Sequence, residues 1–231
     1  MRVWDVAAGY LNRQSLLAEH RELHGLRSIL VHGKKGYSQH PETLRWVGCL
    51  SGLAQRHELL RAEMELRGWR HATPVAEAAP QARWPASYVT PPGEQFALLK
   101  SKYTDKPGGR IPLPRDAQTL WAGHKYSVMA RSPEIYRHMG RRVAAMRTAA
   151  SYAALAEELV VILRERPEAG RLMNALEHMW GHVSAAASQE EKRGARESAP
   201  RLLAVVCAIA LRIGEPFLLA STALGELAAY T

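Results

Sequence analysis

The sequence predicts an all-α fold made of a helical core, a long proline-rich irregular connector and a C-terminal helical bundle. Apolar residues recur at helical spacing over most of the chain, and no stretch shows the alternation typical of a strand. Eight of the 13 prolines fall within residues 73–117, where they remove amide donors and break helices. With 231 residues and 47% hydrophobic composition, the chain can bury a sizeable core.

The first third of the sequence predicts an extended or irregular stretch at residues 1–10, followed by two helices. A helix over 12–31 starts at Asn12 as N-cap and carries an apolar face that includes Leu16, Leu23 and Leu30. A second helix is predicted over 42–67, and Gly68 stands where a C-terminal glycine would end it. Between the two lies a basic, glycine-containing loop at 32–42.

The segment 76–117 is predicted to be an irregular basic connector. It separates a core at 1–75 from a helical domain at 118–231 that packs on that core. Cations surround Gly108 and Gly109, which suits phosphate contacts: Lys100, Lys102, Lys106 and Arg110.

Six further helices are predicted after the connector, over 117–131, 133–148, 150–165, 167–187, 200–213 and 215–230. Four prolines lie near the expected starts, where proline is tolerated: Pro133, Pro167, Pro200 and Pro216. The run LLAVVCAIAL at 202–211 is only ten residues long, so it predicts a buried core helix and not a membrane span.

Charge and cysteine usage narrow the class of protein. The formal net charge is +9, and residues 1–150 hold 23 Lys and Arg against 12 Asp and Glu, so a polyanion would meet this part of the chain. Cys49 and Cys207 are too few for a disulfide scaffold and too far apart for a paired zinc motif. Because MRVWDVAAGY also lacks a signal-peptide pattern, we expect a reducing, cytoplasmic location.

The stretch RQSLLAEHRELH at 13–24 concentrates ionisable groups on one helix. Gln14, Ala18, Arg21 and Gly25 stack on one face with Glu22 beside them, so a carboxylate and a guanidinium lie next to two very small residues. Such a face could admit another backbone closely. The simpler interpretation is a solvated face with charge pairs three and four residues apart.

No cofactor motif is evident. His20 and His24 are four residues apart, but HREL places Arg21 where the H-E-x-x-H zinc motif needs glutamate, so no metal is predicted. The pair His178 and His182 is expected to pack as polar side chains. The sequence also lacks P-loop, Rossmann and G-x-S-x-G patterns.

The motifs MRVWDV, RQSLLAEHRELH, GKKGYSQHPETLRW and HELLRAEMELRGWRHATP together resemble the pyrimidine-dimer DNA glycosylase (endonuclease V-like) family. The likeness covers residues 1–75 and, more loosely, 90–102. It implies a helical enzyme that acts on ultraviolet-damaged, double-stranded DNA and needs no cofactor. Residues 118–231, with NALEHMWGHVS at 174–184, resemble the YbgA-like helical domain of unknown function.

The glycosylase resemblance implies that the α-amine of Met1 is the nucleophile and that Glu22 is the second essential group. An α-amine titrates near about 7.7–8, against about 10.4 for lysine, so a useful fraction is unprotonated at neutral pH. It would attack the deoxyribose and form an imine, and Glu22 would move protons for β-elimination at the abasic site. Ser15 and Gly25 depart from the family pattern. The resemblance therefore indicates the type of reaction more firmly than it indicates the substrate.

The resemblance and the basic residues together predict a DNA surface, with further cations and rings from the loop and the second half. The predicted contacts are Arg2, Arg13, Gln14, Arg21, Arg27, Lys34, Lys35, Tyr37, His40, Lys125, Arg131, Arg137 and Arg141. A nucleoid-associated protein fits this set. Two alternatives stay open: a non-catalytic binder of damaged DNA, and a helical adaptor for an unknown protein partner.

Overall fold

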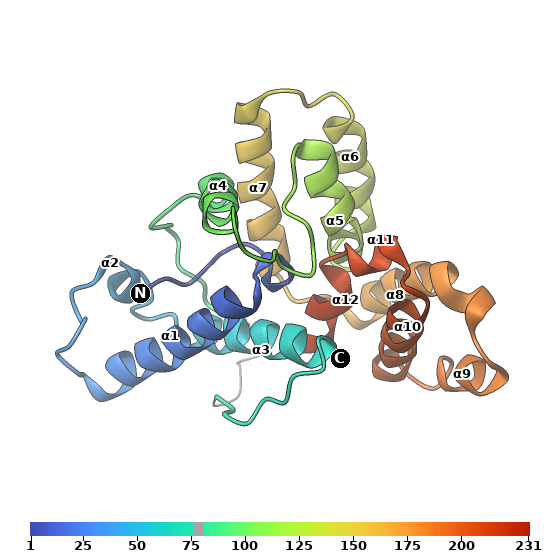
Figure 1. Cartoon of the computed structure of the whole chain (residues 1–231), viewed down its shortest axis with the longest axis horizontal. Helices are drawn as coiled ribbons and strands as arrows, with labels where there is room; N and C mark the ends of the chain where they lie inside the picture. The colour runs from blue at the N-terminus through green and yellow to red at the C-terminus, as the bar shows by residue number, and fades with distance from the viewer. Residues whose placement is uncertain (76–80) are drawn as a thin grey trace.

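The structure is a computed structural model that describes residues 1–75 and 81–231. Within these residues it contains twelve α-helices, three short 3₁₀ helices and no strand, so the predicted all-α class is confirmed (Figure 1). None of the described helices combines the length and hydropathy that crossing a bilayer requires.

Helix α1 (Arg13–His32) follows the short 3₁₀ helix η1 (Ala8–Tyr10) and agrees closely with the prediction. Asn12 caps it as expected, because its side chain accepts a hydrogen bond from the Ser15 amide at 2.9 Å. Gly33 ends it with φ of 62°, a left-handed conformation that glycine adopts without steric cost. Leu16, Leu23 and Leu26 are buried on its inner face.

The single helix predicted over 42–67 is divided in two, α2 (Pro41–Arg45) and α3 (Leu50–Leu66). The break coincides with Gly48, whose φ is 74°, and it lets the Trp46 ring turn inward to 1% exposure. The Trp46 indole N–H donates to Glu42 at 3.0 Å, which fixes the turn between the two helices. The prediction of one continuous helix over 42–67 is therefore wrong at this turn.

The connector is not irregular throughout, because it contains helix α4 (Pro92–Lys102). The expectation of an irregular segment is therefore wrong for these residues. Pro92 occupies the first turn, where the missing amide costs no hydrogen bond, and the residues that follow favour helix. Phe96 and Leu99 of α4 are buried.

The remaining helices occupy nearly the predicted ranges. They are α5 (Ala117–Met129), α6 (Pro133–Val143), α7 (Ala149–Arg164), α8 (Ala169–Val183), α9 (Gln189–Gly194), α10 (Ala199–Ile213), α11 (Pro216–Leu219) and α12 (Ala223–Glu226), with the 3₁₀ helices η2 (Ser184–Ala186) and η3 (Leu227–Ala229). The last predicted helix is broken into α11, α12 and η3, and α9 was not predicted. The run at 202–211 lies in α10 and contributes six buried residues to the core, as expected of a core helix.

Two hydrophobic cores organise the fold. The first joins the N-terminal segment, α1 and α3 to α4, α6 and α7, and the second joins α8 and α10 to α11 and α12. Helix α5 contributes to both, with Leu120 in the first core and Met129 in the second. Packing therefore crosses the predicted boundary at residue 118, since α6 and α7 belong to the core of the N-terminal part.

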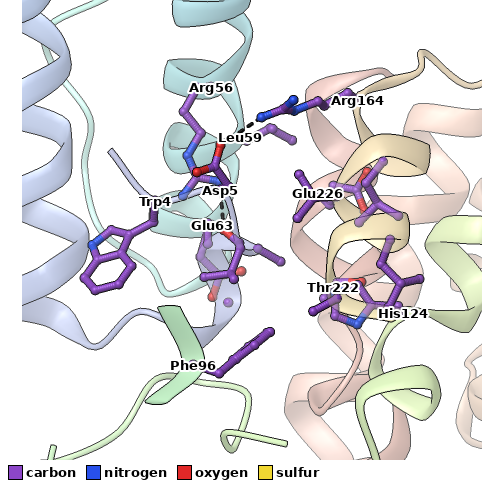
Figure 2. A pocket seen from close by; sticks show the side chains of 18 of the residues that line it. Trp4, Asp5, Arg56, Leu59, Glu63, Phe96, His124, Arg164, Thr222 and Glu226 are labelled. Atoms are coloured by element: carbon purple, nitrogen blue, oxygen red, sulfur yellow. Dashed lines mark hydrogen bonds and ion pairs between the residues drawn. The ribbon is translucent and has the colours of Figure 1, made fainter. Parts of the chain in front are cut away.

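The seam between the cores holds a cavity of about 60 Å³, shown in Figure 2. Ligand pockets commonly measure about 300–1,000 Å³, so this cavity suits packing and a trapped water rather than a substrate. Nearby, Glu63 of α3 accepts from Arg67 at 2.8 Å and from Arg110 at 2.7 Å. Arg110 also donates to the carbonyl of Leu219 at 2.7 Å, which joins the connector to the second core.

Gly109 allows the connector to approach the N-terminal segment closely. A Cβ at this position would lie 2.5 Å from the backbone of Tyr10, whereas one at Gly108 would meet nothing within 4 Å. We expect Gly109→Ala to lower the free energy of unfolding by about 1–3 kcal/mol, because the backbone must move apart. Gly108→Ala is the matched control and should stay within about 0.5 kcal/mol in urea denaturation. Equal effects of the two variants would contradict the close approach.

Candidate active site

A depression of about 440 Å³ lies where the start of the chain meets α1. Met1 lines it from the N-terminal segment, Glu22 and Gly25 line it from α1, and Lys34 and Tyr37 line it from the loop after α1. Ser28 and Ile29 complete the lining. The two residues expected to carry the chemistry therefore line one surface depression, although they are 21 positions apart in the sequence.

A buried ion pair fixes the N-terminal segment on α1. The Glu19 carboxylate is 1% exposed and receives both the Arg56 Nε at 2.7 Å and the Arg56 Nη2 at 2.9 Å. The same carboxylate accepts the Trp4 amide at 3.1 Å, and Arg56 Nη1 donates to the Val6 carbonyl at 3.0 Å. Arg56 and Glu19 thus hold the backbone of residues 4–6 directly against the helix.

This anchor explains how Met1 and Glu22 come to line the same depression. Glu22 follows Glu19 by three residues on α1, so it lies on nearly the same face about 4.5 Å further along the axis. The three residues before Trp4 span at most about 10 Å when extended, which suffices to carry Met1 one turn along the helix. The Thr43 hydroxyl of α2 contacts Met1 Sδ at 3.5 Å, which orients the first side chain.

Asp5 provides a second anchor that sequence reasoning missed. Its amide donates to Gln95 of α4 at 2.8 Å, and its carboxylate pairs with Arg45 at 3.0 Å and Arg164 at 2.8 Å. Arg164 lies 159 residues away on α7, so the start of the chain is tied to the second half of the fold (Figure 2). No local pattern in the sequence could indicate a contact over that separation.

The Glu22 carboxylate is only partly buried. Among the described residues, no hydrogen bond or ion pair engages it, and none joins it to the Met1 amine. Glu22 thus offers a half-buried carboxylate in a surface depression that Met1 also lines, open to a molecule that enters there. An α-amine and a carboxylate are groups that can carry out nucleophilic attack and proton transfer.

Of the DNA contacts predicted near the N-terminus, Lys34 and Tyr37 line the depression itself. Arg2 is positioned by the Thr90 hydroxyl at 3.2 Å and lies over the Trp4 ring, and Arg13 lies over the Trp69 ring. Tyr37 is 70% exposed. The others are exposed or, for Arg27, half-buried: Gln14, Arg21, Arg27, Lys34 and Lys35.

His40 and the contacts predicted in the second half have other surroundings. His40 caps α2, since its Nδ1 accepts the Glu42 amide at 3.1 Å. Lys125 is half-buried with its ammonium 3.9 Å from the centre of the Phe217 ring. Arg137 and Arg141 are exposed on α6, which lies well away from the N-terminus in Figure 1.

The prediction that Arg131 contacts DNA is not supported, because Arg131 is 5% exposed. Its guanidinium donates to the carbonyls of Ser127, Leu163 and Glu165. It also pairs with Glu226 of α12. Arg131 therefore holds α5, α7 and α12 together inside the protein.

Two segments of the chain match models of known protein families. Neither the curated proteins nor the solved structures gave a match. Residues 125–200 match the model of a family described as a protein of unknown function (DUF1722). Residues 1–77 match the model of the pyrimidine dimer DNA glycosylase family, so the segment that carries Met1, Glu22 and the surface depression is similar to enzymes of this repair family.

Proposed function

We propose that the protein is a DNA glycosylase with abasic-site lyase activity, using the Met1 α-amine as nucleophile and Glu22 as the acid–base group. The observation that carries the proposal is the shared depression, in which Met1 and Glu22 face the same space beside Lys34 and Tyr37. The family match of residues 1–77 supports the reaction class.

The chemistry follows from the two groups. The amine nitrogen attacks C1′ of the damaged nucleotide, the C1′–N bond to the base breaks, and the base leaves with a proton. The sugar ring opens as the amine loses its protons, which leaves an imine between Met1 and C1′. The Glu22 carboxylate then takes a proton from C2′, the 3′ phosphate leaves, and water hydrolyses the imine.

The surface around the depression suits a distorted duplex. Arg2, Arg21, Lys34 and Lys35 provide positive charge for phosphates, and the exposed Tyr37 ring can stack on a base that has left the helix. Pyrimidine dimers are the proposed lesion, in keeping with the family match. The cations of α6 are not needed for this surface.

Borohydride trapping tests the proposal. Protein whose mass and N-terminal sequence establish a free Met1 amine is mixed with ultraviolet-irradiated or abasic duplex DNA and sodium borohydride. We expect a covalent protein–DNA adduct, because borohydride reduces the imine, and peptide mapping should locate it on Met1. The absence of an adduct on every lesion substrate would overturn the lyase mechanism. An adduct on a lysine would overturn the role of Met1.

Gly25 tests the docking face separately. A Cβ there meets nothing within 4 Å, so Gly25→Ala should raise the free energy of unfolding by about 0.5–1 kcal/mol through helix propensity. The same methyl group narrows the depression, and we expect severalfold weaker binding of irradiated duplex in a fluorescence titration. Gly181→Ala is the matched control, because Gly181 is also helical and open, and it should stabilise without changing binding. Unchanged binding in Gly25→Ala would show that DNA does not approach this face.

A further inference from the structure

Four of the ten histidines gather where α1 packs against α3 and the segment that follows it. His20 and His24 come from α1, His57 comes from α3, and His71 comes from the segment that follows α3. The Nε2 atom of His20 lies 3.2 Å from that of His57, 3.0 Å from that of His71 and 3.3 Å from that of His24. The ligand atoms of His20, His24 and His57 all lie within 4.8 Å of one another.

Hydrogen bonding among the rings cannot account for this arrangement. A neutral imidazole nitrogen carries one hydrogen or offers one lone pair, so the His20 Nε2 can form one good hydrogen bond among its three contacts. The other two contacts bring nitrogens together without a hydrogen to share. A cation bound between the rings would explain the short distances, because each Nε2 atom would then donate its lone pair to the cation.

The three separations around His20 are close to those between neighbouring ligands of a tetrahedral metal site. Zinc–imidazole bonds measure about 2.0–2.1 Å, which places neighbouring nitrogens of a tetrahedron about 3.3–3.4 Å apart. The three separations around His20 are 3.0, 3.2 and 3.3 Å. Imidazole nitrogens prefer borderline divalent transition metals to the oxygen-seeking Mg²⁺ and Ca²⁺. We propose that His20, His24, His57 and His71 bind one Zn²⁺ ion.

The contacts outside the cluster support the site. With Nε2 turned to the ion, His57 Nδ1 donates to Glu58 at 3.2 Å, the carboxylate–histidine pairing that orients many zinc ligands. Glu58 is in turn held by Arg61 at 2.7 Å.

The neighbouring arginines are compatible with a cation. Arg21 is exposed, so water and salt screen its charge, and Arg27 is partly exposed. Glu58 and Glu65 of α3 place negative charge near His71 and offset them. The lack of an H-E-x-x-H motif excludes a zinc-protease site on α1 alone, whereas two of the four histidines come from α3 and the segment after it.

Four protein ligands leave no open coordination position, so the ion is structural. It would tie α3 and the segment after it to α1 at the turn that carries Glu22, because His20 and His24 lie two residues on either side of Glu22. Zinc binding stands independently of the proposed glycosylase reaction. It is expected to persist in Glu22→Gln and in a protein that cleaves no DNA.

Metal content and binding test the inference on the full chain without a histidine tag. We expect about one equivalent of zinc per chain by mass spectrometry of the purified protein, or after the chelated protein is reloaded. Co²⁺ in place of Zn²⁺ should give the intense visible absorption of a tetrahedral site, and Zn²⁺ should raise the melting temperature of the chelated protein.

Variants separate the site from adventitious binding. His71→Ala and His24→Ala should each weaken Zn²⁺ binding by at least about tenfold, since loss of even an outer partner has that effect. His71 lies outside the helices, so its variant leaves them intact. His178→Ala is the control, because His178 is exposed on α8, and its affinity should equal that of the wild type. A wild type that binds neither Zn²⁺ nor Co²⁺, or that binds them no better than His71→Ala, overturns the inference.

Discussion

Replacing Glu22 by Gln is expected to lower strand cleavage at ultraviolet lesions by at least about 100-fold. General acid–base groups commonly contribute about 10²–10⁴ to a rate, and glutamine keeps the shape of glutamate without accepting a proton. Binding of irradiated duplex should change little, because the proposed phosphate contacts are Arg2, Arg21, Lys34 and Lys35. Single-turnover cleavage assays and a binding titration at fixed salt measure the two effects.

The stability of Glu22→Gln shows whether a loss of cleavage comes from the chemistry or from unfolding. No hydrogen bond or ion pair of Glu22 within the described chain is lost in Glu22→Gln, so the denaturation midpoint should match that of the wild type. Glu177→Gln, an exposed change on α8, controls for the loss of one negative charge and should cleave normally. Full cleavage by Glu22→Gln would exclude Glu22 as the acid–base group. Lesion binding without cleavage by the wild type would favour a non-catalytic binder.

Local signals predicted the parts of the fold that depend on neighbouring residues. The start of α1 follows from the Asn12 cap, and its end from Gly33 in a left-handed conformation. The interruption between α2 and α3 depends instead on the burial of Trp46, and α4 depends on its packing in the first core. Periodicity and proline counts do not report tertiary burial, which overrides local propensity.

The candidate site divides in the same way. The spacing of Arg21, Glu22 and Gly25 predicted that they share one face of α1. The family resemblance predicted that Met1 and Glu22 act together. The anchors of the N-terminal segment lie far away in sequence, at Arg56 and Arg164, and no local pattern indicates them. Charge alone also cannot distinguish an exposed arginine from Arg131, which the second core buries.

Removing Arg56 is expected to have the largest effect on stability, because Glu19 would remain buried without its partner. Both side chains are almost fully buried, at 4% and 0% exposure. Truncating one partner of such a pair commonly costs about 3–5 kcal/mol, whereas exposed pairs contribute about 0–1 kcal/mol. Arg56→Ala should therefore lower the free energy of unfolding by about 3–5 kcal/mol in urea denaturation. Arg142→Ala, which breaks the exposed pair with Glu158, should lower it by at most about 1 kcal/mol.

The double variant Glu19→Leu with Arg56→Leu distinguishes stability from positioning. Apolar side chains of similar volume can replace a buried ion pair with little loss, so the double variant should be more stable than Arg56→Ala. It nevertheless removes the acceptor of the Trp4 amide and the donor to the Val6 carbonyl, so the N-terminal segment loses its fixed position on α1. We expect a folded protein with little borohydride adduct. Wild-type trapping by the double variant would show that Met1 reaches Glu22 without this anchor, and the ion pair would then have a role in stability alone.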